Sequence, residues 1–308
     1  MKVLLLGYGN VGKAFVELLR ENQLNVKVVG AFKRGGLVAP LGGEEKAVEI
    51  EKGLEQLSPD VLVDVSSPNY VNGEPSVSAY LEAFKRGIHV ITANKAPLAL
   101  KFGEILDEAR KRKASLGFQA TVMSGVPSVN LRRVLPALKV YELRGILNGT
   151  TNYILSKMHD GLSFDQALKE AQEQGFAEPD PTLDVNGFDS AAKLTILANV
   201  YFGCRKSIKD VRFSGIEHID FSEVGRWRNE GLKPKLVAKA SRSELRVSVE
   251  ALTRNDPLYH VDGVTNGLLI RTDIQDIFIS GPGAGPKRAA YGILSDLLII
   301  SSGQSIEF

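Results

Sequence analysis

Apolar residues in the first third of the chain come in short runs that are separated by longer amphipathic stretches. The short runs predict strands at residues 3–6, 26–31, 61–65, 89–92 and 115–118. The stretches between them repeat apolar residues at helical spacing, over residues 11–20, 76–85 and 98–112. Strands that alternate with helices predict an α/β domain with a parallel sheet, and we assign it to residues 1–130.

The pattern changes after about residue 130. Helical spacing comes first, at residues 151–159, 164–174 and 189–202, and strand-like runs follow at 236–240, 245–251, 264–271 and 274–279. Helices clustered before strands predict a second, α+β domain over residues 131–285. We expect the last helical stretch, within residues 286–302, to pack back on the first domain.

Composition narrows the class of protein. A chain of 308 residues is long enough for two hydrophobic cores, and a net charge of +2 is too small for a general nucleic-acid binder. Its single cysteine, Cys204, excludes an intrachain disulfide and fits a reducing compartment. Since no apolar run approaches the roughly 20 residues that span a bilayer, and no signal sequence precedes the first strand, we predict a cytoplasmic protein without a membrane partner.

A glycine-rich turn directly follows the first strand and opens the first helix. It reads Gly7-Tyr8-Gly9-Asn10-Val11-Gly12, the G-x-G-x-x-G spacing of a dinucleotide-binding turn. The first glycine permits the tight turn, the second lets backbone amides approach a pyrophosphate, and the third permits close helix packing. In this context the turn predicts a Rossmann-like domain that binds a nicotinamide cofactor; the alternative is a turn of purely structural use.

The end of the second strand carries two cationic residues. A protein that binds NAD would be expected to have an acidic residue there, which binds the ribose 2′-hydroxyl group. Lys33 and Arg34 stand there. They could neutralise the 2′-phosphate of NADP, which predicts NADP as the preferred cofactor and NAD as a possible one. The alternative is that both are exposed loop charges.

Polar residues also follow the third and fourth strands. Ser66 and Ser67 come after the third strand, and Asn94 and Lys95 come after the fourth. Ligands of open α/β sheets bind at the carboxyl ends of the strands, so we expect these residues near the cofactor.

The loop at residues 175–193 combines rigid Pro and Gly residues with carboxylates. Glu178, Asp180, Asp184 and Asp189 precede Lys193, which lies four residues after Asp189 on one helical face. An isolated Asp-Lys pair of this kind is usually a surface pair worth about 0.3 to 0.5 kcal/mol. Four carboxylates near one lysine instead suit recognition of an ammonium group together with proton transfer from an alcohol.

Four segments in order resemble the homoserine dehydrogenase family over nearly the whole chain. They are Thr92-Ala-Asn-Lys95, Gly145-Ile-Leu-Asn148-Gly149-Thr150-Thr-Asn-Tyr153, Ala177-Glu178-Pro-Asp180-Pro with Asp184, Gly187, Asp189 and Lys193, and Gly281-Pro-Gly283-Ala-Gly285. The resemblance is to the short form, because the chain ends at Phe308 without the ACT or aspartate kinase domain of some relatives.

The resemblance implies a role for each matched residue. Lys193 would exchange the proton with the homoserine hydroxyl, and Lys95 would contact the cofactor and could share in that transfer. Glu178 would bind the substrate ammonium group, and Asp189 would bind substrate or position the lysines. Further substrate contacts would come from Asn148, Gly149, Thr150 and Asp184, and Gly283 and Gly285 would lie on the nicotinamide side.

The resemblance also implies the reaction and the assembly. The enzyme would interconvert L-homoserine and L-aspartate 4-semialdehyde in the biosynthesis of threonine, methionine and isoleucine. We expect a homodimer formed through the second domain, whose strands offer more sheet than its helices can cover.

Two positions depart from the family pattern. The carbonyls of Val122, Ser124 and Val126 match a segment that binds sodium, but Gln119 stands where the family usually has a glutamate. The anionic ligand is missing, which puts sodium binding in doubt. Phe176 replaces the tyrosine that commonly precedes the Ala-Glu-Pro-Asp-Pro segment, and any contact by that hydroxyl is lost.

Two alternatives compete with this interpretation. Aspartate-semialdehyde dehydrogenase is another two-domain NADP enzyme, but it uses a nucleophilic cysteine, and Cys204 has no histidine near it in sequence. A non-catalytic NADP sensor is the second alternative, although a sensor would not need Glu178, Asp189 and Lys193 together. The four histidines are scattered without metal-ligand spacing, so zinc chemistry has little support.

Overall fold

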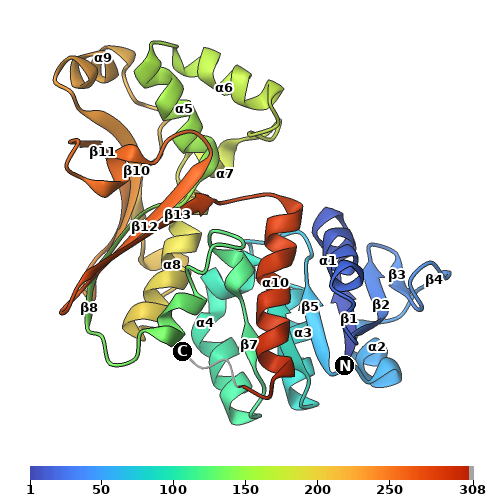
Figure 1. Cartoon of the computed structure of the whole chain (residues 1–308). Coiled ribbons are helices and arrows are strands. Elements are labelled where there is room, and N and C mark those ends of the chain that lie inside the picture. Colours follow the sequence, from blue (N-terminus) through green and yellow to red (C-terminus); the bar gives the residue numbers. More distant parts are fainter. Residues whose placement is uncertain (305–308) are drawn as a thin grey trace. The chain divides into compact units, whose positions relative to one another are not determined.

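The computed structural model describes residues 1–304 and divides the chain into two compact units (Figure 1). Unit 1 comprises Met1–Arg133 together with the described residues from Ala284 on, and unit 2 comprises Val134–Gly283. The predicted boundaries, at residues 130 and 285, lie within three residues of these. Each unit is built on its own sheet.

Unit 1 contains a sheet in which the described strands follow the order β4-β3-β2-β1-β5-β6-β7. The strands from β2 to β7 in this order pair in parallel, whereas β3 and β4 add an antiparallel edge. This arrangement confirms the predicted Rossmann-like parallel sheet. The strand bounds are β1 Lys2–Leu6, β2 Lys27–Lys33, β3 Gly36–Val38, β4 Glu45–Lys46, β5 Val61–Asp64, β6 His89–Thr92 and β7 Leu116–Gly117.

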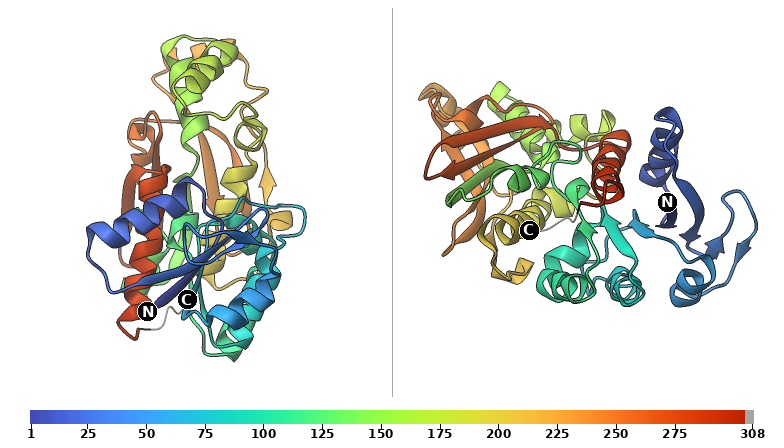
Figure 2. Two further views of the ribbon diagram at one scale, coloured as in Figure 1. Left: turned by 90° about the vertical axis from the view of Figure 1, so that its right-hand side faces the viewer. Right: turned by 60° about the horizontal axis from the view of Figure 1, so that its bottom comes forward.

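Helices cover both faces of this sheet, with α1 and α10 on one face and α3 and α4 on the other (Figure 2). Their bounds are α1 Asn10–Glu21, α2 Ile50–Leu57, α3 Ser76–Lys85, α4 Lys95–Lys111 and α10 Pro286–Ser301. Buried Phe15 of α1 and Ile293 of α10 belong to one core cluster with Val3, Leu5 and Val63 of the central strands. The last helix therefore completes the core that the first strand begins.

Unit 2 contains a mixed sheet whose described strands follow the order β13-β12-β8-β10-β11-β9. All of these neighbours pair antiparallel except β11 and β9, which pair in parallel. The second sheet, together with the helices of the unit, fits the predicted α+β class. The strands are β8 Val140–Ile146, β9 Arg212–Phe213, β10 Lys233–Ala240, β11 Leu245–Leu252, β12 Thr265–Thr272 and β13 Asp276–Pro282.

Helices α5 and α8 of unit 2 carry four of the residues predicted for the site: Gly149, Thr150, Asp189 and Lys193. Their bounds, with the others, are α5 Gly149–Asp160, α6 Phe164–Glu173, α7 Thr182–Val185, α8 Phe188–Phe202 and α9 Phe221–Asn229. Both α5 and α8 pack on β8 or β10. Both helices therefore pack on the same sheet.

Several elements differ from the sequence prediction. Strand β8 precedes the helices of unit 2, although helices were expected first, because its alternating charged residues resemble a loop in sequence. The strand edge β3–β4 and the helices α2, α7 and α9 were also not predicted. Helix α4 begins at Lys95 rather than residue 98, since Asn94 caps it and Pro97 is tolerated in a first turn. Across residues 1–304, no helix has both the length and the apolar character needed to cross a membrane.

Candidate active site

The glycine turn of unit 1 has the geometry that its spacing predicts. Gly7 has φ +92°, and a Cβ there would lie 2.8 Å from the backbone nitrogen of Ser66, so only glycine fits. A Cβ at Gly12 would lie 3.2 Å from a methyl group of Val65, the residue after β5, which reflects the close approach of α1 to the end of that strand. By contrast, a Cβ at Gly9 would meet no atom within 4 Å.

The N-terminus of α1 is available to an anion. Gly9 is its N-cap and offers no side chain, and the first turn, which starts at Asn10 and Val11, contains no acidic residue. Unsatisfied amide groups and the helix dipole both favour a negatively charged ligand at such an end. The residues of the turn therefore fit the pyrophosphate of a dinucleotide.

The two cations at the end of β2 lie beside this turn. The Lys33 ammonium is 6.0 Å from the ring centroid of Tyr8, which lies between the first two glycines. Arg34 follows in the turn that leads from β2 into β3, and both side chains are exposed. The structure thus brings Lys33 to the glycine turn, while Arg34 stays in solvent.

Polar groups gather where β5 and β6 end. Asn94 caps α4 by accepting a hydrogen bond from the Ala96 amide, and its Nδ2 lies 3.2 Å from Ser66 Oγ. Ser67 is exposed, and Lys95 is half-buried as the first residue of α4. These predicted residues therefore share one edge of the sheet.

Two residues at this edge were not predicted. Asp64 ends β5 and accepts hydrogen bonds from the Ser66 amide at 2.8 Å and from the Tyr80 hydroxyl. Burial of Tyr80, and then the negative charge of Asp64, raise the pKa of that hydroxyl well above its usual value. It therefore remains a hydrogen-bond donor that fixes Asp64 and, through it, the turn at Ser66.

The proposed sodium ligands of unit 1 already accept hydrogen bonds. Gln119 Nε2 lies 2.6 Å from the Val126 carbonyl and 3.2 Å from the Ser124 carbonyl. The Val122 carbonyl accepts a hydrogen bond from Ser128 Oγ at 2.7 Å. Within residues 1–304, no group of three or more His, Cys, Asp or Glu side chains could hold a metal ion.

Four of the polar residues predicted in unit 2 form one connected cluster: Asn148, Asp184, Asp189 and Lys193. Lys193 is 8% exposed, and its Nζ lies 2.7 Å from Asp189 Oδ2 and 2.6 Å from the Leu147 carbonyl. The amide of Asn148 donates to Asp184 at 2.6 Å and to Asp189 at 2.9 Å. The Asp189–Lys193 pair is therefore buried rather than an exposed surface pair.

Local sequence explains how these side chains come together. Asn148 caps α5, because its Oδ1 accepts a hydrogen bond from the Thr151 amide, and this leaves its Nδ2 for the two carboxylates. Gly187 has φ +86° and reverses the chain between α7 and α8. The short connection brings Asp184 and Asp189 to the same amide. The Leu147 carbonyl, which sequence reasoning missed, lies at the end of β8 and receives the lysine.

The loop before α7 is tied to helix α5 through its backbone. Thr150 Oγ1 donates to the Phe176 carbonyl at 2.7 Å, and the Phe176 ring lies 5.0 Å from that of Tyr153. Glu178 is exposed, so the structure does not bury it with the Lys193 cluster. Gly149 is needed for packing, since a Cβ there would lie 2.8 Å from the Val264 carbonyl.

The two glycines after β13 also have packing reasons. A Cβ at Gly283 would overlap the side chain of Asn266, and Gly285 has φ +119° where α10 begins. Their expected contact with the nicotinamide stays a prediction.

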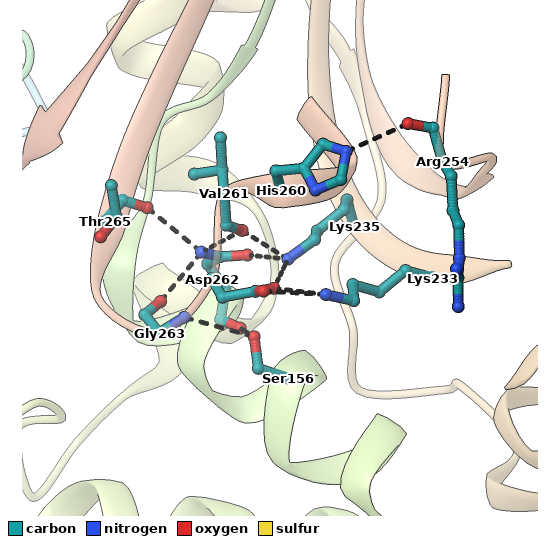
Figure 3. Close-up of polar contacts among 10 residues, drawn as sticks. Ser156, Lys233, Lys235, Arg254, His260, Val261, Asp262, Gly263 and Thr265 are labelled. Carbon is teal, nitrogen blue, oxygen red and sulfur yellow. Dashed lines mark hydrogen bonds and ion pairs between the residues drawn. The ribbon is translucent and has the colours of Figure 1, made fainter. Parts of the chain in front are cut away.

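Helix α5 is anchored by a buried lysine that the sequence did not indicate (Figure 3). Lys235 of β10 is fully buried, and its Nζ lies 3.1 Å from Asn152 Oδ1 of α5 and 2.8 Å from Asp262 Oδ1. The Asn152 amide donates to the carbonyls of Val261, Gly263 and Thr265 at 2.9 to 3.1 Å. Burial lowers the pKa of Lys235, and Asp262 opposes that shift. This network fixes the helix whose first turn carries Asn148 and Thr150.

Cys204 does not have the environment of an activated nucleophile. It is half-buried, and burial raises the pKa of its thiol above the usual value. A raised thiol pKa reduces the thiolate fraction that attacks a carbonyl carbon. Chemistry of the aspartate-semialdehyde dehydrogenase type is thereby disfavoured.

Comparison with known protein families gives two matches that together span most of the chain. Residues 128–298 match the family "Homoserine dehydrogenase", and residues 7–119 match "Homoserine dehydrogenase, NAD binding domain".

Individual relatives match over nearly their full length. A homoserine dehydrogenase of Sulfurisphaera tokodaii is 53% identical, with 97% of this chain and 98% of the relative covered. A homoserine dehydrogenase of Methanocaldococcus jannaschii is 37% identical at the same coverage.

Solved structures agree with these matches. A putative homoserine dehydrogenase of Archaeoglobus fulgidus has a TM-score of 0.89 and 32% identity, covering 97% of this chain and 99% of that one. A hyperthermophilic archaeal homoserine dehydrogenase in complex with NADPH has a TM-score of 0.85 and 27% identity, with 98% of each chain covered.

Proposed function

Since this chain belongs to the homoserine dehydrogenase family, we propose that it oxidises L-homoserine to L-aspartate 4-semialdehyde, and catalyses the reverse reduction, with Lys193 as the residue that exchanges the proton. The family confirms the predicted class of enzyme, an NAD(P)-dependent oxidoreductase that acts on a hydroxyl group, and does not favour the sensor. The buried cluster of Lys193, Asp189 and Asn148 is the observation that supports the role of Lys193.

Unit 1 supplies the residues that would hold the cofactor. The amides at the start of α1 suit the pyrophosphate, Lys33 beside Tyr8 suits a 2′-phosphate, and the strand-end residues Ser66 and Asn94 suit the remaining part of the dinucleotide. When bound, the nicotinamide supplies the hydride acceptor for oxidation and the hydride donor for reduction. Lys95, the first residue of α4, is our candidate for a residue that contacts the cofactor and could share in proton transfer.

Unit 2 supplies the groups for substrate and proton. Lys193 donates a proton to the oxygen of the aldehyde during reduction, and its neutral amine accepts the hydroxyl proton during oxidation. Asp189 and the Leu147 carbonyl orient Lys193, while Asn148 orients Asp189 and Asp184. The exposed carboxylate of Glu178 is free to turn towards the substrate ammonium group.

Lysine substitutions measured at 340 nm with L-homoserine test the assignment. Loss of a proton-transfer residue typically costs 10²- to 10⁴-fold in rate, so Lys193→Ala should lower kcat by that factor and leave the Kd for NADPH nearly unchanged. Lys206→Ala is the control, because it removes another Lys-Asp pair of the same spacing that is about 40% exposed. If Lys193→Ala keeps its kcat while Lys95→Ala loses it, the two roles are reversed.

The preference for NADP is a separate proposal. Replacing Lys33 and Arg34 together by Ala should weaken NADPH far more than NADH, because only NADPH carries the 2′-phosphate that charge-assisted hydrogen bonds hold. The control is Arg20→Ala with Lys27→Ala, two exposed cations that make the same change of charge in unit 1. Binding constants and turnover must be measured separately, since tight NADP could slow its own release. Equal losses for both cofactors would reject the preference.

We also propose a homodimer formed through unit 2. Tyr141 of β8 is 58% exposed and Phe278 of the edge strand β13 is 40% exposed, which leaves apolar side chains on this sheet for a partner. Light scattering at micromolar concentration should give twice the chain mass, and Tyr141→Arg should reduce that mass. A monomer at all concentrations would contradict the assembly.

The cellular setting follows from the proposed reaction. We propose that the enzyme acts in the biosynthesis of threonine, methionine and isoleucine, as the family resemblance implies, and that it works in the cytoplasm. Growth of a homoserine-requiring strain that expresses this chain would test the pathway, and cell fractionation would test the compartment.

A further inference from the structure

The side chain of Gln119 has all its hydrogen-bonding capacity satisfied inside unit 1. It is 1% exposed and lies in the short 3-10 helix Gln119–Thr121 that follows β7. Its Nε2 donates to the carbonyls of Ser124 and Val126, as described above. Its Oε1 accepts from the amides of Val129 at 3.1 Å and Asn130 at 2.8 Å.

The backbone determines which way this amide points. In the opposite orientation, Nε2 would face two N–H groups and Oε1 would face two carbonyl oxygens, so all four hydrogen bonds would become repulsive contacts. The nitrogen of Gln119 therefore has to lie between the two carbonyls. A cation that bound these carbonyls would have to displace an amide group that is held from its other side.

The loop that Gln119 holds is conformationally strained. Met123 has φ +55° and Ser124 has φ +52°, a region that non-glycine residues rarely adopt. Such residues persist only where surrounding contacts fix them. The hydrogen bonds from Gln119 to Ser124 and Val126, and from Ser128 to Val122, are contacts of that kind.

The donor set does not fit sodium. All three carbonyls that the family resemblance assigns to the ion accept hydrogen bonds from neutral side chains, and the residue at position 119 has no negative charge. We propose that the Gln119 amide replaces an alkali cation as the group that holds the loop at residues 122–126, so that this enzyme needs neither Na⁺ nor K⁺.

A single change should restore the need for a cation. In Gln119→Glu, one carboxylate oxygen can still accept from the amides of Val129 and Asn130. The other oxygen then faces the carbonyls of Ser124 and Val126 with no proton between them. A cation between three such oxygens would remove the repulsion, so this variant should acquire cation dependence that the wild type lacks.

The experiment compares thermal unfolding and kcat in NaCl, KCl and N-methylglucamine chloride at constant ionic strength. The wild type and the control Gln56→Glu, an exposed glutamine of unit 1, should unfold at the same temperature in all three salts. Gln119→Glu should unfold about 3 to 8 °C lower in N-methylglucamine chloride and regain stability saturably as NaCl replaces it.

Two results would overturn the proposal. One is a wild-type unfolding temperature or kcat that rises saturably with Na⁺ at fixed ionic strength. The other is a Gln119→Glu variant that loses equal stability in every salt. If that variant does not fold, the wild-type salt comparison and the ²³Na NMR linewidth on titration with wild-type protein decide the matter: unchanged linewidth supports the proposal, and saturable broadening overturns it. The unfolding and NMR measurements need no turnover, so they remain valid if the proposed reaction is wrong.

Discussion

Asp296 makes the stability of unit 1 depend on pH in a direction opposite to that of a typical aspartate. It is fully buried in α10, where its Oδ2 accepts from the backbone N–H of Gln119 at 2.8 Å and its Oδ1 accepts from Asn130 Nδ2 at 2.7 Å. Burial raises its pKa from 3.8 to about 6, and the two hydrogen bonds offset only part of this effect. The folded chain therefore holds a proton that the unfolded chain releases.

The sign and magnitude follow from this difference. Between about pH 4 and pH 6 the folded state binds more protons at Asp296 than the unfolded state does, so stability falls as pH rises through that window. Below about pH 4, Asp296 is protonated in both the folded and the unfolded state, so its destabilising effect vanishes. A difference of about two pKa units corresponds to about 3 kcal/mol, which applies in full above pH 6.

Asp296→Asn removes this titration and can keep the hydrogen bonds. The new amide oxygen can accept from the backbone N–H of Gln119. Its NH₂ group takes the place of the oxygen that faces Asn130 Nδ2, so it can donate once the Asn130 side-chain amide turns over and presents Oδ1, a buried atom that has no hydrogen-bond partner among residues 1–304. We therefore expect a variant that folds and whose stability no longer falls between pH 4 and pH 6 because of this group.

Urea unfolding of the wild type and Asp296→Asn from pH 4 to pH 8 measures the effect. The free energy of unfolding of the variant, minus that of the wild type, should increase by up to about 3 kcal/mol between pH 4 and pH 7. Asp160→Asn, the same change at an exposed position, is the control and should give a flat difference. A flat profile for Asp296→Asn would show that burial does not raise this pKa and would refute the reasoning.

Three further predictions test other parts of the structure. Gly7→Ala should lower the thermal midpoint by several degrees, because of the positive φ and the contact with Ser66, whereas Gly9→Ala should leave it unchanged and raise KM for NADPH; equal midpoints would contradict this contrast. Asn152→Ala should cost about 2 to 4 kcal/mol in urea unfolding, because the carbonyls of Gly263 and Thr265 lose their Asn152 donor and Lys235 loses one of its acceptors. Lys233→Met, which loses an ion pair to the half-exposed Asp262, should cost under about 1 kcal/mol. Thr150→Val should raise KM for homoserine more than it lowers kcat, since it releases the loop at Phe176; steady-state kinetics that show the reverse would place Thr150 in the chemical step.

Much of unit 1 could be predicted because its structure is encoded locally. Strand β6 and helix α3 have the predicted bounds, since an apolar run and helical spacing each identify an element without reference to distant residues. Strand β8 was missed for the opposite reason. Its Arg144 pairs with Glu250 and Asp256, more than 100 residues away, so the charge that resembles a loop in sequence is satisfied only in the folded sheet.

The candidate site also combines features that local sequence determines with features that depend on distant residues. The spacing of Asp189 and Lys193 placed both on one face of a helix, but only the fold shows that the pair is buried and that Asn148, 41 residues before Asp189, donates to its carboxylate. The acceptor for Lys193 is the Leu147 carbonyl, a backbone group that no sequence motif can specify.

Gln119 illustrates how far a departure from a family pattern can be interpreted from sequence. The missing carboxylate put sodium binding in doubt, but its absence alone left open whether carbonyls could still bind the ion. The position of the amide is the basis of our proposal that no ion binds, because the N–H groups of Val129 and Asn130 fix the oxygen on one side and leave the nitrogen facing Ser124 and Val126. The neutral amide of Gln119 thereby contacts carbonyl oxygens that a carboxylate could approach only with a cation between them. One glutamine side chain takes the place of both a glutamate and its cation.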